Sequence, residues 1–163
     1  MALVTSGRVT STDRRWLERA VALAWQARER GDHPFGALLV TPGDDVIEAL
    51  NSVVSRADPT GHAETNLVRL AGKADRASLS GSVLYTSTEP CAMCAGAIYW
   101  SGIGRVVFAL SEQGLADMVD DEEGVPPLRL PSREVFARGG RTIVVDGPVG
   151  LISATAVHEG FWD

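Results

Sequence analysis

Two kinds of hydrophobic pattern alternate along this chain of 163 residues, and the alternation limits the folds that it can adopt. The segment TDRRWLERAVALAWQARERG (12–31) has apolar residues at the spacing of an amphipathic helix, with Thr12 placed to cap it and Gly31 to end it. GALLV (36–40) and DVIEAL (45–50) have the length and composition of strands. The turn signal TPGD between them predicts a hairpin.

The same alternation continues to the C-terminus. TGHAETNLVRLAG (60–72) is predicted as a helix that Thr60 caps and Gly72 ends. The later predicted elements are strands at 82–86, 105–110 and 141–145, a helix at 91–102 and a closing helix at 149–162. Strands that alternate with helices predict an α/β sheet covered on both faces. The acidic and proline-rich segment 111–131 is expected to be a loop beside a site or a solvated surface.

Composition limits the class of protein. With 45% hydrophobic and 22% charged residues, the chain is expected to form one domain over 1–163 without disulfides, with 1–11 flexible. No signal peptide and no apolar run of membrane-spanning length appear, so a cytoplasmic location without membrane contact is expected. The net charge of −6 makes nucleic acid a less favoured partner.

The only two cysteines, Cys91 and Cys94, are three positions apart at the predicted start of a helix, with Pro90 in its first turn. Both sulfurs can reach one ion, and the helix dipole favours the thiolate form that binds metal. Among the three histidines, His33 precedes a proline and His158 is near the C-terminus, which leaves His62 at a helix start. One imidazole and two thiolates predict a zinc ion with an open fourth position for water, as in catalytic zinc sites.

Glu64 is two residues beyond His62 and is placed to exchange a proton with a metal-bound water. Taken alone, this glutamate is an ordinary exposed helix residue, and a C-x-x-C pair is equally typical of thiol–disulfide exchange. A redox motif leaves HAE at 62–64 unexplained, whereas one zinc–water site uses all four residues.

These segments resemble a known superfamily. HAE at 62–64 and PCAMC at 90–94 are similar to the H-x-E and P-C-x-x-C signature of zinc-dependent nucleobase and nucleoside deaminases. The resemblance runs from Trp16 to Ala109 and is strongest to guanine deaminases, then to tRNA adenosine deaminases. It implies the cytidine deaminase-like fold, a three-layer α/β/α sandwich with a five-stranded mixed sheet and the two zinc-ligand helices side by side.

The resemblance also implies substrate contacts. Asn51 matches an asparagine that contacts substrate, although a turn residue at a strand end is the alternative. Trp100 matches a tryptophan of guanine deaminases that stacks on the base, and core packing is its alternative. Phe35 and Gly36 match a pocket-lining segment in which glycine allows close approach to the ligand, with core packing as the alternative for Phe35. Ala63, within the HAE motif, is assigned to the same pocket.

Other features of guanine deaminases match this chain less directly. They carry a second acidic residue that handles the departing amine, for which Asp117, Asp120 and Asp121 are the candidates. Their C-terminal segment crosses to the partner subunit and closes its site with an aromatic side chain, for which Phe161 and Trp162 are available. The resemblance also implies a homodimer.

The predicted activity is zinc-dependent hydrolytic deamination of a free purine base or nucleoside, of guanine type, with release of ammonia. The alternatives are a tRNA adenosine deaminase, a deaminase of another aminated heterocycle such as cytosine, and a non-catalytic binding module that zinc stabilises. No Lys or Arg follows Arg141, which disfavours contact of the C-terminal segment with tRNA phosphates. A basic patch including Arg8, Arg14 and Arg15 would argue the other way.

Overall fold

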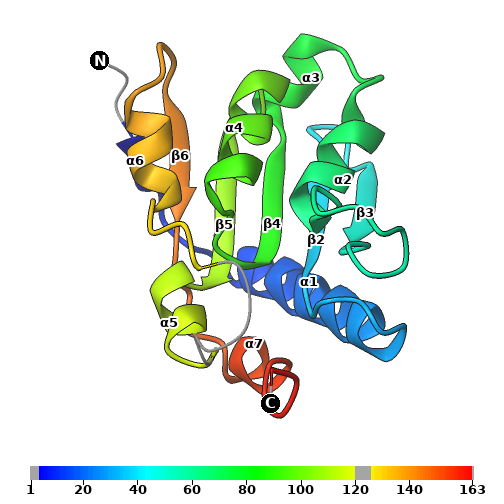
Figure 1. Cartoon of the computed structure of the whole chain (residues 1–163). Coiled ribbons are helices and arrows are strands. Elements are labelled where there is room, and N and C mark those ends of the chain that lie inside the picture. Colours follow the sequence, from blue (N-terminus) through cyan, green and yellow to red (C-terminus); the bar gives the residue numbers. More distant parts are fainter. Residues whose placement is uncertain (1–3, 120–125, 163) are drawn as a thin grey trace.

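The computed structural model describes residues 4–119 and 126–162. Six strands of these residues form one mixed sheet in the order β1-β6-β5-β4-β2-β3 (Figure 1). The strands are β1 (Val4–Thr5), β2 (Gly36–Val40), β3 (Val46–Leu50), β4 (Val83–Thr88), β5 (Arg105–Leu110) and β6 (Ile143–Asp146). Strand β2 is antiparallel to β3 and β4, whereas the other neighbours are parallel. The predicted hairpin is confirmed.

Helices cover both faces of the sheet. They are α1 (Ser11–Glu29), α2 (Ala63–Ala71), α3 (Arg76–Gly81), α4 (Ala92–Ser101), α5 (Glu112–Ala116), α6 (Ser132–Ala137) and α7 (Ile152–Ala156). Neighbouring strand residues point to opposite faces, so Leu38 packs in a core with α1 and α7, and Leu39 in a core with α2, α4 and α6. The three-layer α/β/α prediction is confirmed. In the described parts of the chain, no helix is long and apolar enough to cross a membrane.

The sheet has six strands rather than the expected five. The additional strand β1 lies in the segment 1–11. The sequence analysis predicts neither a helix nor a strand in this segment and expects it to be flexible. Val4 pairs with Ile143, and the Gly7 amide donates to Asp146 Oδ1 over 2.6 Å. A strand of two residues is too short to show the alternation of apolar and polar residues that predicts a strand from sequence. Its extended structure depends instead on its pairing with β6.

Two predicted helix caps are wrong. Thr10 rather than Thr12 caps α1, because Thr10 Oγ1 accepts from the Asp13 amide while Asp13 Oδ2 accepts from the Thr10 amide. Helix α2 starts after His62 rather than after Thr60. His62 is therefore the N-cap residue of α2, and its extended backbone turns the imidazole away from the regular helix surface.

Shorter elements differ from the sequence-based expectation because tertiary packing forms them. The closing helix α7 covers only Ile152–Ala156 of the predicted 149–162. Helices α3, α5 and α6 have five or six residues each. Isolated helices of that length are unstable in water, so contacts with the rest of the domain fix them.

A buried ion-pair network fastens α1 to the centre of the sheet. Arg105 on β5 pairs with Asp13 at 2.9 Å and with Asp146 at 2.8 Å. The Tyr85 hydroxyl on β4 donates to Asp13 Oδ1 over 2.7 Å. Burial raises the pKa of Asp13, but hydrogen bonds from Arg105, Thr10 and Tyr85 outweigh it and lower the pKa to about 2. The carboxylate is therefore charged over the physiological range.

Removal of the Arg105 charge is expected to destabilise the fold strongly. Arg105→Met leaves two buried carboxylates without a cation, which costs about 3–5 kcal/mol of the free energy of unfolding. Arg19→Met is the matched control, because the Arg19–Glu48 pair is solvent-exposed and contributes at most about 1 kcal/mol. Urea denaturation of both variants measures the difference, and equal losses would contradict this account.

Candidate functional site

Three potential metal ligands meet at the C-terminal end of β4, where α2 and α4 begin side by side (Figure 1). His62 is the N-cap residue of α2, and Cys91 is the N-cap residue of α4. Pro90 therefore precedes α4 instead of lying in its first turn, while Cys94 does lie in that turn. The ligand atoms of His62, Cys91 and Cys94 all lie within 4.8 Å of one another. The structure thus brings together the three residues that the sequence predicts as ligands.

The spacing of these atoms fits zinc. Zinc binds thiolate at about 2.3 Å and imidazole at about 2.0–2.1 Å, so two such ligands at a tetrahedral angle are about 3.6 Å apart. Cys91 Sγ is 3.5 Å from His62 Nδ1. The Thr65 hydroxyl lies 3.2 Å from Cys94 Sγ and can donate to that thiolate, as partners of metal ligands usually do.

The thiol of Cys91 is prepared for metal binding. A hydrogen bond from Cys94, together with the neighbouring His62, lowers the pKa of the Cys91 thiol in spite of burial, whereas the hydrogen bond to Cys91 and burial raise the pKa of Cys94. Metal affinity therefore does not require alkaline pH to deprotonate Cys91.

Glu64 lies beside the cluster, buried with 5% of its surface exposed. Burial raises the pKa of its carboxyl, and the hydrogen bond from Thr86 opposes that rise only in part. Thr86 Oγ1 is 2.6 Å from Glu64 Oε1 and 3.0 Å from the Thr88 carbonyl oxygen. The single hydroxyl proton can satisfy the carboxylate, or it can turn to Thr88 when Glu64 itself donates. Both protonation states of Glu64 thus have a partner, which suits a group that carries protons.

Aromatic side chains form a wall next to the metal cluster. The Phe35 ring lies 5.3 Å from His158 and 6.1 Å from Trp162 between ring centroids. Trp162 also lies 5.4 Å from His33, whose pKa is lowered by burial and by the charge of His62. His158 Nε2 lies 3.5 Å from Thr88 Oγ1, and Thr88 is three residues before Cys91, so these aromatic side chains lie near the end of β4 that carries the metal ligands. The C-terminal aromatic residues thus pack on their own chain, whereas the resemblance implies packing on a partner subunit.

Asn51 shows features of both of its interpretations. Its Oδ1 accepts from the Val53 amide over 3.0 Å, which is the bond of a turn residue. Its own amide donates to the Phe35 carbonyl oxygen, so it lies against the aromatic wall. Among the described residues no acceptor contacts its side-chain NH2 group, and no fully buried side-chain nitrogen is left without a partner. Asn51 as a whole is 1% exposed, so only a small part of this NH2 group is accessible.

Gly36 and Ala63 are buried for reasons of packing. A Cβ atom on Gly36 would lie 2.5 Å from the Ala20 carbonyl oxygen and the Ala24 amide nitrogen of α1. The sequence analysis expected glycine at position 36 to allow a close approach to a ligand. In the structure, it is the backbone of α1 that approaches Gly36 closely. Ala63 is fully buried at the first position of α2.

Two predicted site residues lie away from the cluster. Trp100 is 81% exposed in the last turn of α4, nine residues beyond Cys91, or about 13 Å along the helix axis. It therefore lies neither in the core nor beside the metal ligands of its own chain. Asp117 is exposed and accepts from Gln113 Nε2 at the end of α5. Asp120 and Asp121 lie outside the described residues.

The structure adds acidic groups that the sequence analysis missed. Glu89, two residues before Cys91, accepts hydrogen bonds from the Glu112 amide and from the amide and hydroxyl of Ser132. It thereby holds the starts of α5 and α6 beside the cluster. Burial and the charges of Glu89 and Cys91 raise the pKa of Glu112 to about 7. Because Glu89 directly precedes Pro90 and Cys91 in the sequence, its place near the metal ligands could have been predicted. Glu112 is distant in sequence and comes near Glu89 only through folding.

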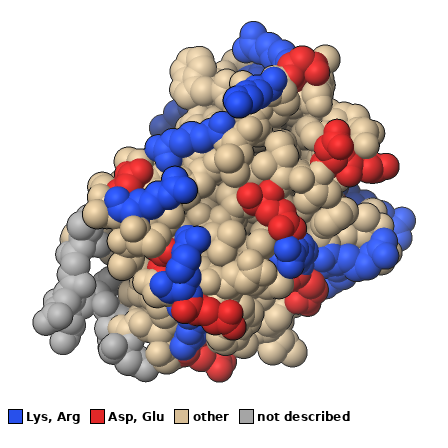
Figure 2. All heavy atoms as spheres, turned by 90° about the vertical axis from the view of Figure 1, so that its right-hand side faces the viewer, with Lys and Arg blue, Asp and Glu red and all other residues tan. Residues whose placement is uncertain are grey.

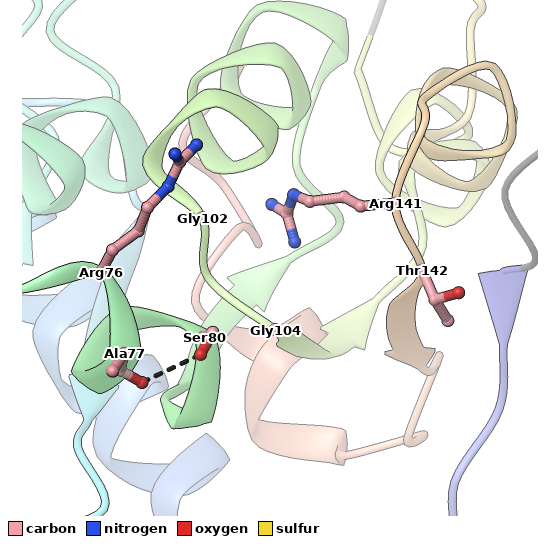
Figure 3. A pocket seen from close by; sticks show the side chains of 7 residues that line it. All are labelled: Arg76, Ala77, Ser80, Gly102, Gly104, Arg141 and Thr142. Atoms are coloured by element: carbon pink, nitrogen blue, oxygen red, sulfur yellow. Dashed lines mark hydrogen bonds between the residues drawn. The ribbon is translucent and has the colours of Figure 1, made fainter.

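A separate cavity of about 510 Å³ lies near the start of β5, at the other end of α4 from the metal ligands. Its lining includes Arg76 and Arg141, whose side chains extend toward one another (Figure 3). Arg141 donates to the carbonyl oxygens of Tyr99 and Ile103. It thereby provides hydrogen-bond donors for carbonyl groups at and just after the C-terminal end of α4. This cavity contains none of the groups predicted for chemistry.

Comparisons with known proteins agree with this geometry. Residues 10–110 match the family model "Cytidine and deoxycytidylate deaminase zinc-binding region". The chain is 41% identical over 160 residues to a probable cytosine deaminase of Schizosaccharomyces pombe, covering 98% of each chain. It is 41% identical over 109 residues to the guanine deaminase of Bacillus subtilis, covering 66% of this chain and 70% of that one. A solved structure from a study of A-to-I editing by tRNA:A34 deaminases is 27% identical, with a TM-score of 0.68, covering 88% and 99%.

Loss of one thiolate is expected to remove the metal. Cys94→Ser should lower bound zinc from about one ion per chain to less than about 0.1, because two remaining protein ligands hold zinc weakly. Thr65→Val, which removes only the hydroxyl near Cys94, is the control and should lower affinity about 10–100-fold while retaining zinc in excess metal. Elemental analysis after dialysis measures both, and full zinc content in Cys94→Ser would refute this ligand.

Proposed function

Since the chain belongs to the cytidine and deoxycytidylate deaminase zinc-binding family, we propose that it deaminates a free nucleobase, with guanine as the first candidate substrate. That it is a zinc-dependent hydrolytic deaminase follows from the family. A small flat heterocycle as the substrate, free or within a nucleoside, is supported above all by the aromatic wall of Phe35 and Trp162, which His158 links to the end of β4. Such a wall stacks on one flat heterocycle.

The proposed roles follow from the chemistry of each side chain. His62, Cys91 and Cys94 would hold zinc, which lowers the pKa of a bound water towards about 7 and supplies hydroxide at neutral pH. Glu64 acts as the proton carrier, delivering a proton to a ring nitrogen and then to the departing amine. Water thus replaces the exocyclic amino group of the base, which leaves as ammonia. The free NH2 group of Asn51 is the donor for a polar group on the base.

A tRNA substrate has less support. Tight binding of tRNA requires several phosphate contacts from clustered Lys and Arg. On the face that carries α2 and β3, the basic side chains are spread out and acidic ones lie among them (Figure 2). The net charge of −6 adds a repulsive background. These features favour a small substrate.

Cytosine is the second candidate, and one observation favours it. The similarity to the S. pombe relative extends over 160 residues, whereas that to the B. subtilis guanine deaminase covers 109. A match over 98% of this chain includes most of the C-terminal segment that carries His158 and Trp162. The similarity to the probable cytosine deaminase therefore extends into the segment that carries the aromatic wall, which supports cytosine as the second candidate.

A second copy of this chain is the proposed partner for α4. The sequence of this helix, AMCAGAIYWS, contains no charged residue, and its exposed positions include Met93 and Trp100. A surface helix that is apolar all round is normally covered. The homodimer implied by the resemblance would cover it, so the exposure of Trp100 in one chain supports pairing across α4.

Turnover of a panel of bases tests the proposed function. Zinc-loaded protein is expected to release ammonia from guanine, and Glu64→Gln should retain zinc while losing about 10²–10⁴-fold in kcat. Turnover of cytosine but not guanine would select the second candidate. Activity only on tRNA, or none on any base or nucleoside with zinc present, would refute the proposal.

Introduction of a charge on α4 is expected to separate the subunits. Trp100→Glu should shift the molar mass measured by light scattering from that of a dimer towards a single chain, because the apolar surface would have to bury a carboxylate. Ile152→Glu is the control, since Ile152 is 90% exposed on the other face of the sheet. A wild-type monomer, or an unchanged dimer in Trp100→Glu, would contradict the interface.

A further inference from the structure

His158 is a buried titratable side chain for which the proposed chemistry has no use. It is 1% exposed and follows α7 in the C-terminal segment. The indole N–H of Trp162 donates to its Nδ1 over 3.3 Å, and the two rings stack at 14° with centroids 6.1 Å apart. Its Nε2 lies 3.5 Å from Thr88 Oγ1 at the end of β4. The His158 imidazole therefore links the aromatic wall to strand β4.

The hydrogen bonds fix the protonation state of this imidazole. An indole N–H can only donate, so Nδ1 of His158 must be the unprotonated nitrogen. The proton of the neutral ring is then on Nε2, which donates to Thr88 Oγ1. Burial and the nearby charge of Arg28 lower the pKa of His158 to about 4, so the neutral ring persists at physiological pH.

The backbone around His158 is also held in place. Arg28 of α1 donates to the carbonyl oxygens of Val157 and Glu159, on either side of His158, over 2.8 and 2.7 Å. Its guanidinium also lies over the Phe161 ring. Arg28 fixes the chain path, but it does not determine the orientation of the Trp162 ring. The Trp162 ring also contacts the rings of His33, Phe35 and Phe161, and its N–H donates to His158.

We propose that His158 is a positioning residue that orients Trp162 as the wall of the base pocket and thereby sets the affinity for the substrate. The residue acts through Trp162, which packs on Phe35 and His33, and it does not itself meet the reacting atoms. The effect on substrate rests on the proposed function, whereas the orientation of Trp162 does not. A wall held in one orientation binds a flat ring without first paying the entropy of ordering.

Two substitutions at the same position separate the hydrogen bond from the volume. His158→Phe keeps an aromatic ring against Phe35 but removes both hydrogen bonds, whereas His158→Asn keeps an acceptor near the place of Nδ1. In His158→Phe, KM for the base is expected to rise about fivefold or more with kcat within about twofold, because one hydrogen bond that orders the free site is lost. His158→Asn is expected to recover most of the wild-type KM.

The orientation of Trp162 is measured without substrate. The indole N–H signal of Trp162 in a nitrogen-15 spectrum, identified by its absence from Trp162→Phe, should exchange with water about fivefold or more faster in His158→Phe. The control Trp16→Phe removes another indole, whose ring lies against Tyr85 of β4 rather than against the wall, and should leave this signal and KM unchanged. Zinc content and thermal unfolding show that each variant is folded and loaded.

Coupling between the two residues provides the decisive comparison. The double variant His158→Phe/Trp162→Phe should raise KM no more than Trp162→Phe alone, because His158 acts through Trp162. Additive losses, a fall confined to kcat, or an unchanged exchange rate of the Trp162 indole in His158→Phe would overturn the proposal. If no base is turned over by the wild type, the proposed function fails, and the exchange rate alone still decides the role of His158.

Discussion

The hydrogen bonds at the end of β4 are the constraint on which the site depends. Thr86 holds the Glu64 carboxyl, Thr88 lies against His158, and Glu89 accepts from the first residues of α5 and α6. Cys91 follows three residues after the strand. Because β4 is an interior strand paired with β2 and β5, its end has a fixed position. The proton carrier, a metal ligand and the pocket wall are therefore all placed relative to one rigid backbone.

Buried charge is treated differently in two parts of the molecule. Around Arg105, two carboxylates pair with one guanidinium, and hydrogen bonds from Arg105, Thr10 and Tyr85 lower the pKa of Asp13 in spite of its burial. Glu64 is equally buried but has a hydroxyl as its hydrogen-bond partner, so its pKa is raised. An acid left in this state is poorly suited to stabilise a fold and well suited to exchange protons.

The sequence predicts those features that depend on neighbours within a few residues. The spacing of Cys91 and Cys94, and the place of His62 at a helix start, are local, so the ligand set and the α/β order can be predicted from sequence. The cap of α1 is also a local feature, and the sequence analysis missed it: Asp13, three residues beyond Thr10, completes a capping box with Thr10 and so selects that cap over Thr12.

The remaining differences come from contacts between distant segments. Gly36 matches a pocket motif, yet the backbone of α1 requires the glycine. His158 has no motif, and only the fold brings it to Thr88, which is 70 residues earlier in the chain. Asp117 and Glu112 lie on the same short helix region, and the direction of α5 decides that Glu112 is the one near Cys91. Sequence spacing carries no information about that direction.

Helix α4 connects the two ends of this arrangement. Its N-terminus supplies Cys91 and Cys94, and its last turn exposes Trp100. Within one chain, Arg28 and His158 hold the C-terminal segment and its aromatic side chains on α1 and β4. The proposed pairing of subunits involves α4. It would stabilise the helix that carries two of the three metal ligands, so dimerisation would act on zinc retention before it acts on the recognition of the base.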